Sequence, residues 1–114
     1  MLLRENRLIS GRDFDAVYRE GRFLSSGNLS LKARKNGLGK TRIGFSIGLK
    51  FSPEAVKRNK ARRWLREIAR KQMENIQKSV DIVVMLKKEA TFPTYQELEN
   101  NFQKALLRGN LTIK

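Results

Sequence analysis

The sequence predicts an α+β sandwich in which helices pack on a central sheet. Short runs with strand periodicity alternate with amphipathic helical stretches, and the order along the chain is helix, strands, long helix, strand, helix. A chain of 114 residues is long enough for one domain and too short for two. We therefore assign residues 1–114 to a single domain.

The first half begins with a short helix and two alternating runs. Ser10 and Asp13 have the spacing of a capping box, and Gly21 marks the end of the helix. Residues 29–35 alternate between apolar and polar side chains, as in a half-buried strand, and residues 36–39 form a turn. In the next run, the two predicted faces carry Ile43, Phe45, Ile47 and Leu49 on one side, and Arg42, Gly44, Ser46 and Gly48 on the other.

The second half begins with the longest helix. Ser52 is expected to cap this helix, with Pro53 at its first position, and the helical pattern continues to about residue 75. Residues 80–86 are almost continuously apolar, which indicates a strand covered on both faces. Thr94 and Glu97 form a second predicted capping box, and the last helix should end at residue 109.

The charge balance points to a polyanionic partner. The chain has 25 Lys and Arg against 11 Asp and Glu, a net charge of +14. Residues 1–72 carry 19 basic and 6 acidic residues, whereas residues 73–114 carry 6 and 5, so the partner should meet the first two-thirds. No apolar run approaches the roughly 18 residues of a membrane span, and no signal peptide is evident. We expect a cytoplasmic protein that binds nucleic acid and no membrane.

The composition argues against a complete catalytic site. Histidine and cysteine are absent, which removes the commonest general base, the thiol nucleophile, disulfides and structural zinc. The acidic residues form no metal-binding cluster, and Asp13 and Asp15 would point to different sides of a helix. We predict no catalytic residue, and the sequence shows no metal-binding site, although it leaves direct metal binding by the protein open. A nuclease that acts alone through carboxylates is the weakest alternative.

The most informative segment is the basic part of the long helix. Eight basic and two acidic residues lie between positions 53 and 73. Like charges four residues apart destabilise a helix by about a few tenths of a kcal/mol per pair, whereas guanidinium groups suit phosphate. The pattern favours a nucleic-acid-binding face over a solvated helix face or a DNA major-groove helix. Its central stripe is Arg58, Arg62 and Arg66, with Asn59, Arg63 and Arg70 beside it.

Four segments together resemble the protein subunit of bacterial ribonuclease P. They occur in the family's order and extend over nearly the whole chain, although no single segment is specific. The segments are residues 13–21 with Leu8 ahead of them, residues 42–47, the basic run of Arg58, Asn59, Lys60, Arg62, Arg63, Arg66 and Glu67, and residues 81–84.

The resemblance implies a subunit of a ribonucleoprotein endoribonuclease that removes the 5′ leader of precursor tRNA. The catalytic RNA subunit would hold the Mg²⁺ ions, and the protein alone would be inactive but would strengthen and broaden substrate recognition. The implied partners are this RNA and precursor tRNA, with no obligate protein partner. The implied fold contains a left-handed βαβ crossover through the long helix, against the general rule.

The resemblance also implies two sets of binding residues. The set that would contact the catalytic RNA subunit is Arg58, Asn59, Lys60, Arg62, Arg63 and Arg66. The set that would hold the leader, in a cleft between the sheet and the first helix, is Phe14, Tyr18, Lys32, Ser46, Lys87 and Lys88. The residues themselves agree in part, because Gly44, Ser46 and Gly48 would leave room for RNA beside aromatic rings that can stack on bases. Core packing is an equal alternative for Phe14.

Three departures from the family pattern qualify these assignments. The third signature position is often arginine and is Lys60 here, which keeps the charge but loses bidentate geometry. A strand position that is often aromatic is Lys32, so contact there would be more electrostatic. Residues 48–55 replace a Ser-Lys-Lys and Gly-Asn pattern, so no contact is carried over from that loop. The alternative function is a ribosomal or general RNA-binding protein without a role in cleavage.

Overall fold

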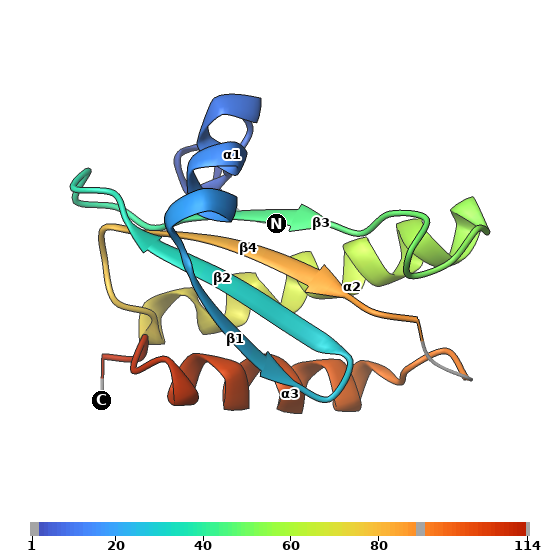
Figure 1. Cartoon of the computed structure of the whole chain (residues 1–114). Helices are drawn as coiled ribbons and strands as arrows, with labels where there is room; N and C mark the ends of the chain where they lie inside the picture. Colours follow the sequence, from blue (N-terminus) through green and yellow to red (C-terminus); the bar gives the residue numbers. More distant parts are fainter. Residues whose placement is uncertain (1–2, 89–90, 114) are drawn as a thin grey trace.

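Four strands form one mixed sheet in the order β1–β2–β4–β3 (Figure 1). The computed structural model describes residues 3–88 and 91–113. The strands are β1 (Arg22–Ser26), β2 (Leu29–Lys35), β3 (Arg42–Ser46) and β4 (Val80–Leu86). The helices are α1 (Gly11–Glu20), α2 (Ala55–Gln72) and α3 (Tyr95–Arg108), with short 3-10 helices η1 (Arg4–Asn6) and η2 (Met73–Asn75).

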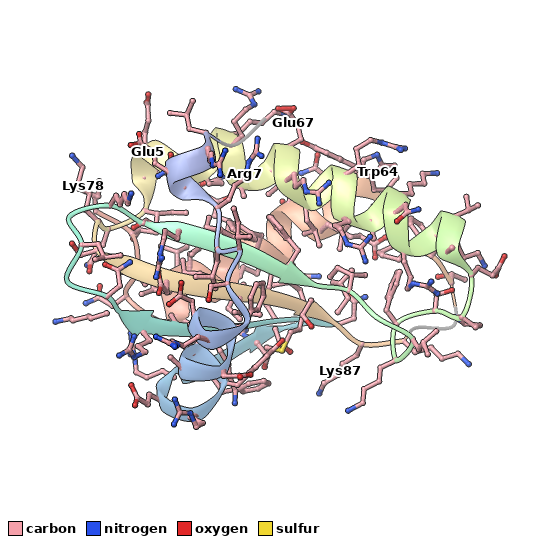
Figure 2. All side chains as sticks on the ribbon, turned by 90° about the horizontal axis from the view of Figure 1, so that it is seen from above. Glu5, Arg7, Trp64, Glu67, Lys78 and Lys87 are labelled. Carbon is pink, nitrogen blue, oxygen red and sulfur yellow. The ribbon has the colours of Figure 1, made fainter. Side chains whose placement is uncertain are left out.

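The helices lie on both faces of the sheet. In Figure 1, α2 and α3 lie behind the sheet and α1 lies in front of it, and the view from above in Figure 2 shows the same division. Strands β3 and β4 are parallel neighbours joined through α2, and the other pairings are antiparallel. Because β3 lies above β4, both run to the right, and α2 returns behind them, this crossover is left-handed (Figure 1). The expected α+β fold is confirmed.

The main core lies between the sheet and the two rear helices. The inward face of β4 contributes alternate residues, and α2 and α3 supply the apolar stripes that cover them. The predicted capping box of α3 is present, since Thr94 Oγ1 accepts from the Glu97 amide and the Glu97 carboxylate accepts from the Thr94 amide. The fully buried side chains include Leu29, Leu31, Leu65, Ile68, Ile82, Leu98, Phe102 and Leu106.

The opposite face of the sheet, here called the α1 face, is built from three cross-strand rows. In the register of the sheet, Met85 on β4 lies between Ser30 of β2 and Ser46 of β3. Two residues earlier on β4, the row is Lys32, Val83 and Gly44, and the last row is Arg34, Asp81 and Arg42. Helix α1 covers only part of these three rows, because its residues Val17 and Phe14 pack around Val83 in the middle row.

A buried ion network fixes α1 to the sheet. Asp81 is 1% exposed, and its two carboxylate oxygens accept from Arg42 Nε at 2.9 Å and Nη2 at 2.7 Å. The remaining Arg42 nitrogen reaches Asp13 of α1 at 3.1 Å. The hydrogen bonds to Asp81 raise the pKa of Arg42 above its ordinary value, and the attraction of Asp13 adds to this effect. The guanidinium group therefore ties the first helix to the central strand.

The structure corrects four details of the elements. Ser10 caps α1 through the Arg12 amide and not through a capping box, because Asp13 pairs with Arg42. Strand β1 was not predicted, since its five residues show no clean alternation. The run after Thr41 ends at Ser46, so Leu49 lies in a turn closed by the Phe51 amide on the Gly48 carbonyl and is 74% exposed. Helix α2 begins at Ala55, and the Ser52 hydroxyl accepts from the Glu54 amide ahead of it.

Among the residues that the structure describes, no helix is both long enough and apolar enough to span a bilayer.

The ion network predicts unequal effects for its two carboxylates. Asp81→Asn should lower the free energy of unfolding by about 3 kcal/mol, because it removes the fully buried carboxylate and leaves the partly buried Arg42 guanidinium group without its main counter-charge. Asp13→Asn should cost at most about 1 kcal/mol, because Asp13 is partly exposed. Urea unfolding of both variants measures the difference. Equal losses would show that the buried carboxylate is not what holds Arg42.

Candidate nucleic-acid interface

The first candidate surface is the outer side of α2 and its edge beside β3. All six residues that the resemblance assigns to contact with the catalytic RNA lie on this helix, but their surroundings differ. Arg63 and Arg66 are exposed and make no hydrogen bond or ion pair with any residue in the described ranges. These two guanidinium groups can therefore meet an external phosphate at little cost to the fold.

Arg58 and Arg62 are tied to the loop that joins β3 to α2, residues 47–54. Arg62 Nη2 donates to the Ile47 carbonyl at 2.8 Å, and Arg62 Nη1 donates to the Asn59 side chain at 2.8 Å. Arg58 Nη1 donates to the Ser52 carbonyl at 3.0 Å. Each arginine retains further N–H donors for a phosphate. Both residues therefore shape the loop while they present charge to a partner.

Lys60 is placed by an aromatic cluster. Its Nζ lies 4.8 Å from the Trp64 ring centroid and 5.4 Å from that of Phe92. The rings of Trp64 and Phe92 meet edge-on at 5.8 Å, and Tyr95 packs edge-on against Trp64. The Trp64 ring is half-buried, packs against the edge of the main core and faces Phe92 and Tyr95. Cation–π contact holds the ammonium group at the surface.

The second candidate surface is a groove of about 610 Å³ on the part of the α1 face that α1 leaves open. Its floor is the row of Ser30, Met85 and Ser46 across three strands. The β3–α2 loop forms one wall, and Figure 2 shows Lys87 on the side of the molecule away from Trp64 of α2. The aromatic, apolar and cationic side chains that line the groove are Tyr18, Phe23, Leu49, Lys50, Lys87 and Lys88.

Four of the six predicted leader-binding residues line this groove, and two do not. Tyr18, Ser46, Lys87 and Lys88 are brought together there. Phe14 instead occupies the space above Gly44, where an added Cβ would lie 2.4 Å from the ring. The prediction that Gly44 leaves room for RNA is therefore wrong, because the Phe14 ring already fills that room.

Lys32 supports Tyr18 rather than lining the groove. Its Nζ donates to the Tyr18 carbonyl at 2.8 Å and lies 5.9 Å from the Tyr18 ring centroid. That carbonyl belongs to the last turn of α1, where the helix lacks its own donors and a cation is favourable. The interaction fixes the end of α1 and with it the ring that enters the groove.

Sequence reasoning missed several residues of the groove. Phe23 is on the strand that was not predicted, Leu49 was grouped with the apolar face of its run, and Lys50 lies in the loop from which no contact was carried over. Met85 was taken only as part of a buried strand. The strand register would have identified Phe23 and Met85, because Phe23 lies beside Lys32 and Met85 lies beside Ser46 on the same face of the sheet. This register cannot be known before the order of the strands is known.

Within the described ranges, no group of three or more acidic, histidine or cysteine side chains is arranged to hold a metal ion.

Comparison with known proteins adds independent findings. The sequence profile of the family described as Ribonuclease P matches residues 2–109. The chain is 38% identical over 94 residues to a ribonuclease P protein component of Finegoldia magna, covering 82% of this chain and 81% of that protein. It is 41% identical over 86 residues to the Thermotoga maritima ribonuclease P protein component, covering 75% and 73%.

Solved structures agree with the fold. The RNase P protein from Thermotoga maritima in complex with 1-(4-fluorophenyl)-2-thiourea superposes with a TM-score of 0.81 at 35% identity, covering 90% of this chain and 98% of that one. The RNase P protein from Staphylococcus aureus gives a TM-score of 0.83 at 25% identity, covering 100% and 97%. With a profile match over most of its length and relatives above 30% identity, the chain belongs to the family of ribonuclease P protein components.

Proposed function

We propose that the protein is the subunit of ribonuclease P that docks on the catalytic RNA through α2 and holds the 5′ leader of precursor tRNA in the groove. The observation that carries the proposal is the presence of two separate basic surfaces, the α2 edge and the groove, on either side of β3 and its following loop. A protein with a single nucleic-acid partner needs only one such surface. Two surfaces suit a protein that contacts an RNA subunit and a substrate at once.

The groove has the properties that single-stranded RNA requires. Its floor is made of small or flexible side chains, the Tyr18 ring of α1 lines it, and lysines follow the end of β4. Single strands bind to such sites through stacking on rings and through phosphate contacts, without reading base edges. The 5′ leader is the single-stranded part of precursor tRNA that is absent from mature tRNA, and it is therefore the substrate segment that suits this groove.

The chemistry of cleavage belongs to the RNA in this proposal. The chain has no histidine or cysteine, so no side chain offers an imidazole or a thiolate for hydrolysis. Mg²⁺ ions held by the RNA subunit would activate the water and stabilise the leaving oxygen. The protein would contribute binding, orientation and neutralisation of phosphate charge.

Cleavage activity tests the proposed function directly. Purified protein alone should leave precursor tRNA intact at any Mg²⁺ concentration, and addition of a bacterial ribonuclease P RNA at low Mg²⁺ should produce cleavage at the mature 5′ end. The RNA alone under the same conditions is the control. A cleavage activity that purifies with the protein and disappears in an Asp or Glu variant would contradict the proposal, as would a protein that does not enhance the RNA.

The two kinds of arginine on α2 should behave differently. Arg66→Ala should weaken assembly with the RNA subunit. It should also reduce the slope of the logarithm of the assembly constant against the logarithm of the salt concentration by about one in magnitude, because one phosphate contact is lost. Arg62→Ala should do the same and also reduce the preference for precursor over mature tRNA, because the loop beside the groove loses its anchor at Ile47. Salt-dependent titrations measure both effects. Lys104→Ala, an exposed cation on α3, is the matched control for general charge.

Identical behaviour of the Arg62 and Arg66 variants toward the two tRNAs would show that the loop does not connect the surfaces.

Tyr18 and the groove lysines should affect only the substrate with a leader. Tyr18→Ala should weaken precursor tRNA binding to the holoenzyme by roughly tenfold, the effect of about 1–3 kcal/mol for a stacked base, and leave mature tRNA binding unchanged. Lys88→Ala should have a smaller effect that decreases as salt rises. Phe14→Leu is the control, since it should lower thermal stability without changing the affinity ratio. Equal losses for both tRNAs would assign these residues to folding or RNA docking.

A further inference from the structure

Phe23 is an aromatic side chain that the core does not use. It lies on β1, an edge strand of the sheet, and is 55% exposed. Its neighbour Leu24 packs against the main core, so alternation directs Phe23 to the α1 face. A single exposed apolar residue needs no explanation, but Phe23 lines the same groove as Leu49, Met85 and the Tyr18 ring. The exposed apolar surface is therefore continuous and lies inside a concave site.

Lys32 lies between Phe23 and Tyr18. Phe23 is the direct cross-strand partner of Lys32 in the β1–β2 pair, which places their Cβ atoms about 5 Å apart. The Lys32 ammonium group donates a hydrogen bond to the Tyr18 carbonyl and lies near the Tyr18 ring. Lys32 thus lies between the Phe23 ring of the adjacent strand and the Tyr18 ring of the adjacent helix, and its ammonium group donates its hydrogen bond to α1.

The rest of the groove defines what can occupy the space beside Phe23. The three lysines Lys50, Lys87 and Lys88 line the same groove, and the whole chain has a net charge of +14. A second copy of this chain would bring these cations together, so self-association through the groove is electrostatically unfavourable. A ligand that combines flat apolar faces with regular negative charge matches both features. Single-stranded nucleic acid is such a ligand.

We infer that Phe23 is a stacking site for one unpaired base of the leader RNA, in the same groove as the lysines that hold its phosphates. The inference rests on the proposed function of the groove and adds a binding residue on β1. Phe23 extends the stacking surface from Tyr18 to the edge of the sheet. In this chain the ring on β1 supplies the flat surface that Lys32 does not.

The test compares three variants in the holoenzyme reconstituted with a bacterial ribonuclease P RNA. Phe23→Ala should weaken binding of precursor tRNA by roughly fivefold or more and leave mature tRNA binding unchanged, because one stacked base is lost. Phe23→Trp should bind precursor tRNA as well as the unaltered protein, since it keeps a stacking plane. Leu107→Ala is the matched control, because Leu107 is 56% exposed but lies on α3, outside the groove.

Abasic nucleotides placed one at a time in the leader identify the stacked base. At one position, loss of the base should weaken binding to the unaltered protein by the same factor as Phe23→Ala and should have no further effect in that variant. If the loss from base removal and the loss from Phe23→Ala add at every leader position, Phe23 is not a stacking site.

The outcomes separate the inference from the function on which it rests. If the unaltered holoenzyme prefers precursor tRNA and Phe23→Ala leaves that preference intact, the stacking site is wrong and the groove function stands. If the unaltered holoenzyme binds precursor and mature tRNA equally, the groove function itself is wrong. A shift of the free protein from dimer to monomer in Phe23→Ala, measured by sedimentation, would assign the ring to self-association instead.

Discussion

The placement of α1 on the sheet is the constraint on which the groove depends. Arg42 connects buried Asp81 to Asp13, and Phe14 fills the space that Gly44 leaves open. These contacts hold the helix over Val83 and away from the row of Ser30, Met85 and Ser46. If the helix were displaced by one row, it would cover the floor of the groove. A buried charge pair is weak evidence for stability, but here it fixes position, because one guanidinium group bonds to carboxylates on both the central strand and the first helix.

The second consequence of this architecture is that the two surfaces share a structural element. The β3–α2 loop forms a wall of the groove, and its carbonyls accept hydrogen bonds from Arg58 and Arg62 on the signature helix. A phosphate that binds Arg58 or Arg62 would either compete with the loop carbonyls for the N–H groups of that arginine or hold the arginine in its present position. In the proposed function, docking of the RNA subunit would be linked to the shape of the groove through these two hydrogen bonds. The link is local and does not require a change in the core.

Much of the fold was predictable because it is encoded by nearby residues. The capping box at Thr94, the apolar run of β4 and the four-residue spacing of arginines on α2 all depend on neighbours in the chain. The missed features depend on partners far along the sequence. Asp13 was assigned to a cap because its real partner, Arg42, is 29 residues away. Leu49 was grouped with the apolar side of its run because alternation does not reveal that the strand ends at Ser46. Phe23 could not be placed without the register of β1 on β2. The left-handed crossover came only from family resemblance, since general rules favour the other hand.

In the proposed arrangement, the leader lies in the groove on the α1 face while the catalytic RNA meets α2. Photo-crosslinking tests it most directly. Precursor tRNA with 4-thiouridine in the leader is irradiated in the assembled holoenzyme, and the crosslinked peptides are identified by mass spectrometry. The account predicts crosslinks in the peptides that contain Tyr18, Phe23 and Met85, and their loss when an excess of leader-containing precursor tRNA without thiouridine competes. Crosslinks confined to α2 around Arg63 and Arg66, or to the outer face of α3, would contradict it.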